Sequence, residues 1–424
     1  MKRRDFLKTT AGTVAAGAVA QALMPASAEA NTQTSRSALP TAPPMALVRI
    51  GYVGIGGMGS AHVNNLLKIP GCRITAVCDV NPERTAWAVK AITAAGHPAP
   101  AVYEKGPRDF ERLCAGEDLD LVYNATPWEW HVPICLAAMK NGKHAAVEVP
   151  AAMSIDDCWA LVESAEKHQK HCVMMENCNY GRMEMLAFHL VRQGLLGEIV
   201  HAEGGYLHDL RDIKFSPRGE GLWRRAWSQK LNGNLYPTHG LGPVANCMDI
   251  NRGDRFDYVV SMSGPSRGLQ NWAAEHFPPD APQRRERYVL GDVNASLIKT
   301  ANGRTIYVVH DTNLPRPYSR IHLVQGTKGL FQGYPDRVYI EGRGKPHQWQ
   351  PASEYLAEFD HPLWKDIAAK AAGASESLPN SEGCPMAISR WVDFAASMAR
   401  SSASLSARRS LCRSEAFSVT SMSS

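Results

Sequence analysis

The fold is decided by the stretch Leu47-Val48-Arg49-Ile50-Gly51-Tyr52-Val53-Gly54-Ile55-Gly56-Gly57-Met58-Gly59. Its first half is an apolar run of strand length, and its second half is the pattern G-x-G-x-x-G at the opening of a helix. The first glycine permits a tight turn, the second lets the backbone approach a pyrophosphate, and the third lets helix and strand pack closely. The stretch therefore predicts a dinucleotide-binding turn, with the helix N-terminus facing the phosphates.

An acidic residue at the end of the next apolar run indicates which dinucleotide binds. Asp79 follows Thr75-Ala76-Val77-Cys78, twenty residues after Gly59. A carboxylate there accepts hydrogen bonds from the adenosine ribose and repels a 2′-phosphate, so NAD is favoured over NADP. The cofactor contacts predicted from this part of the chain are Gly54, Gly56, Gly57, Met58, Gly59 and Asp79.

Strand-like and helix-like segments alternate up to about residue 178. Apolar runs of strand length recur at 74–78, 119–124, 144–147 and 173–176. Ser154-Ile155-Asp156-Asp157 is a capping-box pattern that opens one of the intervening helices. Such alternation is typical of a doubly wound parallel sheet with helices on both faces, and we predict a Rossmann domain over residues 47–178.

The pattern changes after Tyr180. One helix-like stretch leads into longer β-like runs at 199–207, 258–262, 295–300, 305–311 and 321–325. We predict an α+β substrate and catalytic domain with a mostly antiparallel sheet over residues 179–371. Residues 372–424 are rich in serine with few periodic apolar positions, so we predict a divergent, disordered tail there.

The N-terminus is typical of a twin-arginine export signal. The pair Arg3-Arg4 precedes Asp5-Phe6-Leu7-Lys8 and a mild apolar run, and Ala26-Ser27-Ala28 supplies small residues for cleavage. We predict a signal peptide over 1–28, a flexible leader over 29–46, and a periplasmic or secreted protein. The apolar run is too short and weakly hydrophobic to stay as a membrane span, so the predicted partner in transport is the export machinery and no stable membrane anchor is expected.

The charge balance argues against nucleic acid as a partner. The formal net charge is +5, and the predicted signal peptide holds four basic side chains and one acidic one, which leaves the mature chain near +2. A charge so close to neutral gives no strong attraction for nucleic acid or an anionic membrane. The expected partner is a small-molecule or glycan substrate, and the sequence leaves the oligomeric state open, with a homo-oligomer among the alternatives.

The cysteines predict neither a disulfide framework nor a metal site. There are ten, none of them in a C-x-x-C pair, and a domain of this size does not need disulfides. One cluster invites a metal interpretation and consists of His168, His171, Cys172 and Cys178. Its spacing fits no familiar zinc pattern, and the intervening residues have the composition of a core strand.

Two further strand ends relate the chain to known enzymes, because ligands bind beyond the carboxyl ends of parallel strands. The first is Ala125-Thr126-Pro127-Trp128-Glu129-Trp130-His131, and the second is Glu148-Val149-Pro150. A Rossmann start followed by these two turns resembles the glucose-fructose oxidoreductase and inositol dehydrogenase superfamily. In its ordinary sugar dehydrogenases the middle residue of Glu-x-Pro is a catalytic lysine, so Val149 argues against a plain dehydrogenase.

Longer stretches narrow the resemblance. They are Thr126-Pro127-Trp128-Glu129-Trp130-His131, Gly204-Gly205-Tyr206-Leu207-His208-Asp209-Leu210-Arg211, Tyr236-Pro237-Thr238-His239-Gly240, Asp311-Thr312-Asn313-Leu314-Pro315-Arg316-Pro317-Tyr318-Ser319 and His361-Pro362-Leu363-Trp364-Lys365. Together they resemble glycoside hydrolase family 109, whose members are described as NAD-dependent α-N-acetylgalactosaminidases. The likeness runs from about residue 48 to residue 370.

The resemblance implies redox chemistry without net redox. NAD⁺ takes a hydride from C3 of the sugar, the resulting ketone acidifies the C2 proton, a base removes that proton, and the C1 substituent leaves. Water then adds and NADH returns the hydride, so no pair of carboxylates flanking the glycosidic bond is needed. The site requires a positioned base of tunable pKa.

The resemblance also implies residue roles. The cofactor contacts would be Asp79, Trp128, Glu129, Trp130, His131, Glu148, Val149 and Asn177. The sugar contacts would be Tyr206, Arg224, Tyr236, Pro237, Thr238, His239 and Tyr318. The acid/base candidates are His239, Tyr180 and Tyr236, with His239 and Tyr180 favoured. Histidine exchanges protons near neutral pH, whereas tyrosine needs a depressed pKa or a nearby cation, such as Arg224 or NAD⁺.

The chain departs from the family pattern in two places. Gly57-Met58 stands where the family has Asn-Arg, which removes two side-chain donors to the cofactor. The likeness stops near Ala372, and either a shifted reading frame or a divergent tail accounts for this. Two other functions stay open: a sugar oxidoreductase with net turnover, against which Val149 counts, and a non-catalytic exported sugar-binding protein.

Overall fold

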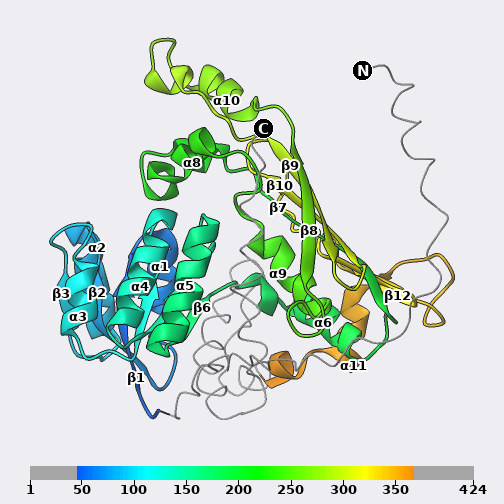
Figure 1. The fold of residues 1–424 in the computed structure, drawn as a ribbon, viewed down its shortest axis with the longest axis horizontal. Helices are drawn as coiled ribbons and strands as arrows, with labels where there is room; N and C mark the ends of the chain where they lie inside the picture. Colours follow the sequence, from blue (N-terminus) through cyan, green and yellow to red (C-terminus); the bar gives the residue numbers. More distant parts are fainter. Residues whose placement is uncertain (1–44, 367–424) are drawn as a thin grey trace, which may run out of the picture. The chain divides into compact units, whose positions relative to one another are not determined.

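The computed structural model describes residues 45–366 (Figure 1). The predicted signal peptide (1–28) and serine-rich tail (372–424) lie outside the described residues, as does nearly all of the predicted leader (29–46). Within residues 45–366, no helix has both the length and the apolar character needed to cross a membrane.

The first sheet has six parallel strands in the order β3-β2-β1-β4-β5-β6. Its elements are β1 (Val48–Val53), α1 (Gly57–Leu66), β2 (Cys72–Cys78), α2 (Pro82–Ala94), β3 (Ala101–Tyr103), α3 (Phe110–Gly116), β4 (Leu121–Asn124), η2 (Trp128–Trp130), α4 (His131–Lys140), β5 (His144–Val147), α5 (Ile155–His168) and β6 (Cys172–Met174). The chain moves outward from β1 to β3 and then returns to the other side of β1. This order confirms the predicted doubly wound sheet.

The turn between β1 and α1 requires glycine. Gly54 has a φ of +89°, and a Cβ on Gly59 would lie 2.1 Å from the carbonyl oxygen of Gly54. Only a residue without a side chain lets α1 approach the end of β1 this closely. A Cβ on Gly56 or Gly57 would meet nothing within 4 Å, so this side of the turn is open.

The last strand of this sheet is shorter than predicted. The strand expected at 173–176 is Cys172–Met174, so Glu176 and Asn177 lie beyond its carboxyl end. The helix before it begins where the capping box predicted, because Ser154 Oγ accepts a hydrogen bond of 3.1 Å from the Asp157 amide. The shorter strand places Glu176 at the edge where ligands of parallel sheets bind.

The second sheet has eight strands in the order β14-β13-β12-β11-β7-β10-β9-β8. All neighbouring strands are antiparallel except β7 and β10, which confirms the predicted mostly antiparallel sheet. The elements are η3 (Cys178–Tyr180), α6 (Arg182–Arg192), β7 (Ile199–Leu207), α7 (Arg211–Phe215), η4 (Gly219–Leu222), α8 (Arg224–Lys230), α9 (Thr238–Cys247), β8 (Phe256–Ser263), α10 (Gly268–His276), η5 (Pro282–Arg285), β9 (Val293–Thr300), β10 (Thr305–Asp311), β11 (Leu323–Gly326), β12 (Gly329–Gln332), β13 (Arg337–Ile340), β14 (Gln350–Pro351), η6 (Ala352–Tyr355) and α11 (Leu356–Phe359).

Helices α6 and α9 share a buried apolar core with this sheet. Leu190 of α6, Val244 of α9 and Ala202 of β7 are all fully buried in it. Burial of this apolar surface drives the helices onto the sheet. It thereby sets the position of the first turn of α9, which carries His239.

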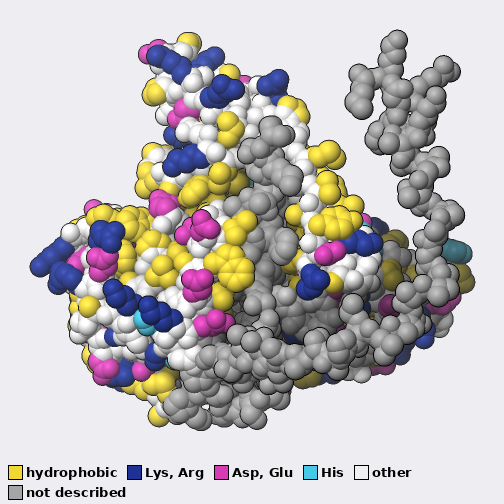
Figure 2. Space-filling model, in the orientation of Figure 1, with side chains coloured by type: hydrophobic (Ala, Val, Ile, Leu, Met, Phe, Trp, Pro, Cys, Tyr) yellow, Lys and Arg dark blue, Asp and Glu magenta, His cyan; other side chains and the backbone are white. Residues whose placement is uncertain are grey.

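Charged side chains of both signs lie on one face of the described residues. On the face drawn in Figure 2, Lys and Arg side chains are interspersed with Asp and Glu side chains. Mixed charges of this kind produce no large field of one sign. This agrees with the small net charge of the sequence.

The contact between α1 and β1 leads to a stability prediction. We expect Gly59→Ala to lower the free energy of unfolding by about 1–3 kcal/mol, because its Cβ would overlap the Gly54 carbonyl and force the backbone apart. Urea denaturation of the purified protein measures this. Gly57→Ala is the matched control, since its Cβ has open space, and it should change stability by less than about 0.5 kcal/mol. Equal effects of the two substitutions would contradict the prediction.

Candidate active site

The predicted cofactor residues follow five strands of the parallel sheet. They are residues 54–59 after β1, Asp79 after β2, residues 128–131 after β4, Glu148 and Val149 after β5, and Asn177 after β6. Because the strands are parallel, these segments come together at one edge. The open side of the glycine turn and the N-terminus of α1 suit a pyrophosphate there. The residues therefore fit a dinucleotide, although Met58 is 53% exposed and supplies no polar donor in place of arginine.

Asp79 is held against the glycine turn. Its Oδ2 accepts a hydrogen bond of 2.6 Å from the Ile55 amide, and its Oδ1 accepts one of 2.9 Å from the Asn81 amide. A carboxylate has about four acceptor positions, so Asp79 can also accept hydrogen bonds from ribose hydroxyls. The residue predicted to select NAD is thus oriented before the cofactor binds.

Glu148 is paired with a histidine that sequence analysis missed. Nε2 of His62, on α1, lies 2.5 Å from Glu148 Oε1. Burial alone would raise the pKa of Glu148, but the hydrogen bond and the charge of His62 hold that pKa below its usual value. The next residue, Val149, is buried in an apolar cluster that includes Tyr206 and Tyr236. The position at which the related dehydrogenases have a lysine is therefore part of an apolar core.

Some side chains of the loop after β4 are buried and others are exposed. His131 is fully buried, and its ring nitrogens lie 2.6 Å from the Pro150 carbonyl oxygen and 2.8 Å from the Thr126 carbonyl oxygen. Burial lowers the pKa of His131, although both carbonyls oppose this. Trp130 packs edge-on against Phe110, and Glu129 is exposed. The imidazole of His131 therefore fixes the loop, and Trp130, predicted as a cofactor contact, packs against Phe110 of α3.

Arg224 lies in a cluster of aromatic rings. Its guanidinium carbon is 5.2 Å from the ring centroids of both Trp128 and Tyr236, and its Nε lies 2.9 Å from Glu220 Oε2. Trp223 and Trp227 also pack on Trp128, at centroid distances of 5.1 and 5.9 Å. Sequence analysis missed both tryptophans, although their spacing of four residues around Arg224 is the spacing of one helix face.

The predicted sugar residues come together beside Arg224. The Tyr206 ring lies 4.7 Å from Tyr236, 5.5 Å from His239 and 6.2 Å from Tyr318, all measured between ring centroids. Pro237 and Thr238 form the start of α9 next to them. These residues come from β7, from the start of α9 and from the segment between β10 and β11. Aromatic faces and an arginine are suited to binding a sugar through stacking and charged hydrogen bonds.

Two glycine contacts bring α9 onto β7. A Cβ on Gly240 would lie 2.1 Å from the Gly205 amide nitrogen, and a Cβ on Gly204 would lie 2.3 Å from the Gly240 carbonyl oxygen. The helix and the strand therefore touch backbone to backbone. Because His239 precedes Gly240 and Tyr206 follows Gly205, their side chains are held close together.

A buried ion pair orients Tyr318. Its hydroxyl accepts a hydrogen bond of 3.1 Å from Arg320 Nη1, and Arg320 is also paired with Glu184 of α6. Burial raises the pKa of Tyr318, although the charge of Arg320 opposes this. Tyr318 is thus a neutral hydroxyl in a fixed orientation.

Tyr180 fits the role of a base poorly. It lies in η3, where its carbonyl oxygen accepts a hydrogen bond of 3.1 Å from Trp364 Nε1. Burial and the charge of Glu176 raise the pKa of Tyr180 to about 12. We expected a cation to depress this pKa, and the structure shows the opposite shift.

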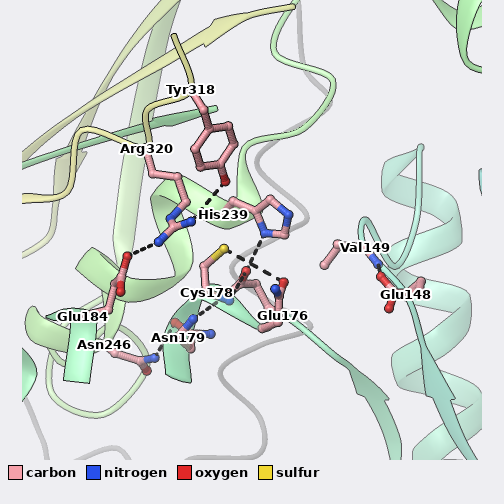
Figure 3. A network of polar contacts seen from close by, with 11 residues as sticks. Glu148, Val149, Glu176, Cys178, Asn179, Glu184, His239, Asn246, Tyr318 and Arg320 are labelled. Carbon is pink, nitrogen blue, oxygen red and sulfur yellow. Dashed lines mark hydrogen bonds and ion pairs between the residues drawn. The ribbon is translucent and has the colours of Figure 1, made fainter. Parts of the chain in front are cut away.

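His239 has a carboxylate partner, which sequence analysis also missed (Figure 3). Its Nδ1 lies 2.6 Å from Glu176 Oε1. Glu176 is 2% exposed and also accepts hydrogen bonds from the amides of Cys178, at 3.0 Å, and Asn179, at 2.7 Å. The position of Glu176 as the last residue of the predicted strand at 173–176 was the available signal, since the carboxyl ends of parallel strands face the ligand edge.

Glu176 and His239, together with the thiol of Cys178, are the one group of side chains in residues 45–366 whose ligand atoms are close enough together to hold a metal ion. Ligand atoms of Glu176, Cys178 and His239 lie within 4.8 Å of one another. Burial and the charge of Glu176 raise the pKa of the Cys178 thiol well above its usual value, which disfavours the thiolate that metals require. Hydrogen bonds among these groups already account for the arrangement.

Two buried basic groups lie behind the sugar cluster. Lys214 Nζ donates hydrogen bonds to Thr312 Oγ1, at 2.9 Å, and to Asn313 Oδ1, at 2.7 Å. Burial and the charge of Arg224 lower the pKa of Lys214 to about 7. Burial, with Lys214 and Arg224, lowers the pKa of His310 to about 3. A further positive charge near Arg224 is therefore unfavourable at Lys214 and His310.

A dinucleotide-binding edge beside tyrosines, an arginine and a carboxylate-paired histidine defines an NAD-dependent enzyme of carbohydrate chemistry. Residues 48–176 match the model for the oxidoreductase family with an NAD-binding Rossmann fold, and residues 180–377 match the model for the C-terminal domain of glycosyl hydrolase 109. The chain belongs to glycosyl hydrolase family 109, and it is an NAD-dependent glycoside hydrolase.

Relatives in sequence and structure support this assignment. The chain is 46% identical over 380 residues to a glycosyl hydrolase family 109 protein of Shewanella pealeana, covering 88% of this chain and 83% of that one. It is 45% identical over 381 residues to one of Saccharopolyspora erythraea, covering 88% and 82%. A levoglucosan dehydrogenase solved with NADH shares the fold, with a TM-score of 0.62 and 21% identity over 87% of this chain and 96% of that one. The predicted family, fold and cofactor are confirmed.

The buried Lys214 leads to a prediction for the pH dependence of stability. Because its pKa falls from 10.5 to about 7 on folding, the unfolded state binds more protons between these values. We expect the free energy of unfolding to gain a positive contribution as pH rises from about 7 to 10.5. Urea titrations at several pH values measure it, and the difference between wild type and Lys214→Met isolates this residue. Parallel pH profiles for the two proteins would contradict the prediction.

Proposed function

We propose that the enzyme hydrolyses terminal α-N-acetylgalactosamine through oxidation, elimination, water addition and re-reduction of the sugar. The main support for this proposal is that a cluster of side chains packs against Trp128 of the Rossmann fold. The cluster consists of Tyr206, Arg224, Tyr236, His239 and Tyr318. Through this contact, the side chains that we propose bind the sugar lie beside the predicted cofactor edge. It is the arrangement that chemistry on a sugar ring with a dinucleotide requires.

The proposed cofactor sites are the glycine turn, Asp79, Glu148 and Asn177. When bound, NAD supplies reversible hydride transfer at C3 of the sugar, which makes the C2 proton acidic. The side chains of the protein bind and orient the sugar and transfer the proton. Tyr206, Tyr236 and Tyr318 bind and orient the ring, Arg224 binds its polar substituents, and His239 accepts and returns a proton.

The pairing of the carboxylates supports this route over ordinary glycoside hydrolysis. Glu148 is paired with His62, and Glu176 is paired with His239. A standard glycosidase needs one carboxyl group to donate a proton and a second to act on the sugar or on water. Glu148 and Glu176 are thus already engaged, whereas a hydride-transfer mechanism does not call on them for those roles.

One experiment tests the proposal. The purified protein, loaded with NAD⁺, is given p-nitrophenyl α-N-acetylgalactosaminide in D₂O. We expect release of nitrophenol without accumulation of NADH, and one deuterium at C2 of the released sugar, because the C2 proton exchanges before water adds. Nitrophenol release with retention of the C2 proton would contradict the elimination route.

Net NADH formation in the same assay would instead support a sugar oxidoreductase with net turnover. The shared fold with levoglucosan dehydrogenase and the presence of a paired histidine favour this as the second candidate. Binding of the sugar with neither product would support the third alternative, a non-catalytic sugar-binding protein.

We also propose that the chain is exported by the twin-arginine route, on the strength of Arg3-Arg4 and Ala26-Ser27-Ala28. We expect the periplasmic protein to begin at Glu29, because cleavage follows Ala28. Arg3→Lys combined with Arg4→Lys should leave uncleaved protein in the cytoplasm. Cell fractionation with N-terminal sequencing measures both, and equal export of the variant would count against the proposal.

A further inference from the structure

The hydrogen bond between Glu176 and His239 has the geometry of an orienting pair. Nδ1 of His239 lies 2.6 Å from Glu176 Oε1, the Cys178 amide donates a hydrogen bond to the same oxygen, and the Asn179 amide donates one to Oε2. Both carboxylate oxygens thus already accept a backbone N–H group, Oε1 from Cys178 and Oε2 from Asn179, so Glu176 acts as an acceptor toward the imidazole. Nδ1 must therefore be the donor, which leaves Nε2 as the acceptor nitrogen.

The surroundings leave this acceptor available. Among the described residues, no side chain forms a hydrogen bond with Nε2 of His239, whereas Nδ1 is fully engaged. The ring lies 4.9 Å from Tyr236 and 5.5 Å from Tyr206, between centroids, so it belongs to the proposed sugar cluster. A histidine with one nitrogen fixed by a carboxylate and the other facing the reacting group is the arrangement of a general base.

The position of Glu176 is itself fixed by close packing with α9. A Cβ on Gly242 would lie 3.4 Å from Glu176 Oε2 and 3.1 Å from Asn179 Oδ1, so the helix rests directly on this turn. Asn246 Nδ2 donates a hydrogen bond of 3.0 Å to Asn179 Oδ1 one turn further on. The carboxylate and the imidazole are therefore held by two elements that cannot shift independently.

We propose that Glu176 is a positioning residue that holds His239 in the Nδ1–H tautomer and thereby makes Nε2 the proton acceptor of the sugar reaction. This role rests on the proposed function, and it adds the residue that orients the base. It also explains how the site handles protons with Val149 in the place of a lysine, because the base lies on α9 instead of at the end of β5.

The first measurement is the tautomer, which does not depend on turnover. A ¹⁵N-labelled, NAD⁺-loaded protein is examined by ¹⁵N–¹H correlation of the histidine rings, and the signal of residue 239 is assigned by its loss in His239→Gln. We expect an Nδ1–H signal that is protected from exchange. In Glu176→Gln, one carbonyl oxygen must serve three donors, so we expect this signal to shift or the proton to move to Nε2.

The second measurement is turnover of the same glycoside. Glu176→Gln should lower kcat on the order of 10²- to 10⁴-fold, the range seen when a catalytic histidine loses the carboxylate that sets its tautomer. KM and bound NAD should stay within about threefold of wild type, because Glu176 is buried and its carboxylate is already bonded to His239 and two backbone amides. Glu176→Asp keeps a carboxylate and should retain the Nδ1–H signal and most of the activity.

A matched control separates positioning from folding. Asp292 is likewise a buried carboxylate, and it accepts hydrogen bonds from the amides of Arg267 and Gly268. Asp292→Asn should lower stability but leave the His239 signal and kcat unchanged. A Glu176→Gln protein with an unchanged His239 signal would overturn the proposal, whether or not kcat falls. Failure of the wild type to release nitrophenol would refute the proposed function, and the spectra would still decide the pairing.

Discussion

The site depends on one close contact between two backbones. Helix α9 touches β7 where Gly240 meets Gly204 and Gly205, at distances that exclude a side chain on Gly204 or Gly240. The contact forces the neighbours of these glycines, His239 and Tyr206, to within 5.5 Å of each other, between ring centroids. A side chain at Gly204 or Gly240 would separate the helix from the strand, and with it the proposed base from the tyrosines.

The same helix connects the site to the parallel sheet. Through Gly242 and Asn246, α9 rests on the turn that follows β6, the last strand of that sheet. On the other side, Trp128 from the loop after β4 packs on Arg224 and Tyr236. The proposed sugar-binding side chains therefore contact the cofactor-binding fold at two places. Ordinary van der Waals packing, which is costly to disturb, thus sets the distance between the proposed base and the cofactor edge.

Local signals made the first sheet and its cofactor turn predictable from sequence. The glycine pattern, the spacing to Asp79 and the capping box at Ser154 each act within a few residues or one strand–helix unit. The hydrogen-bond partners of the predicted site residues could not be found from local patterns. Glu176 and His239 are 63 residues apart, so no local pattern marks their pairing. The pKa of Tyr180 depends on burial and on Glu176, and both arise only when η3 is packed in place.

The electrostatics of the cluster explain why a histidine suits it better than a lysine. Arg224 is buried there and already supplies one fixed positive charge. Burial, with the charge of Arg224 added to it, lowers the pKa of His208, Lys214 and His310. A lysine at position 149 would place a second positive charge in the buried apolar cluster that contains Tyr236, and burying an unpaired charge is costly. Under the proposed tautomer, Nε2 of His239 takes the proton from the sugar, and Glu176 stabilises the positive charge that the ring then acquires. A base that is charged only during the reaction is compatible with this environment, whereas a permanent second cation beside Arg224 is not.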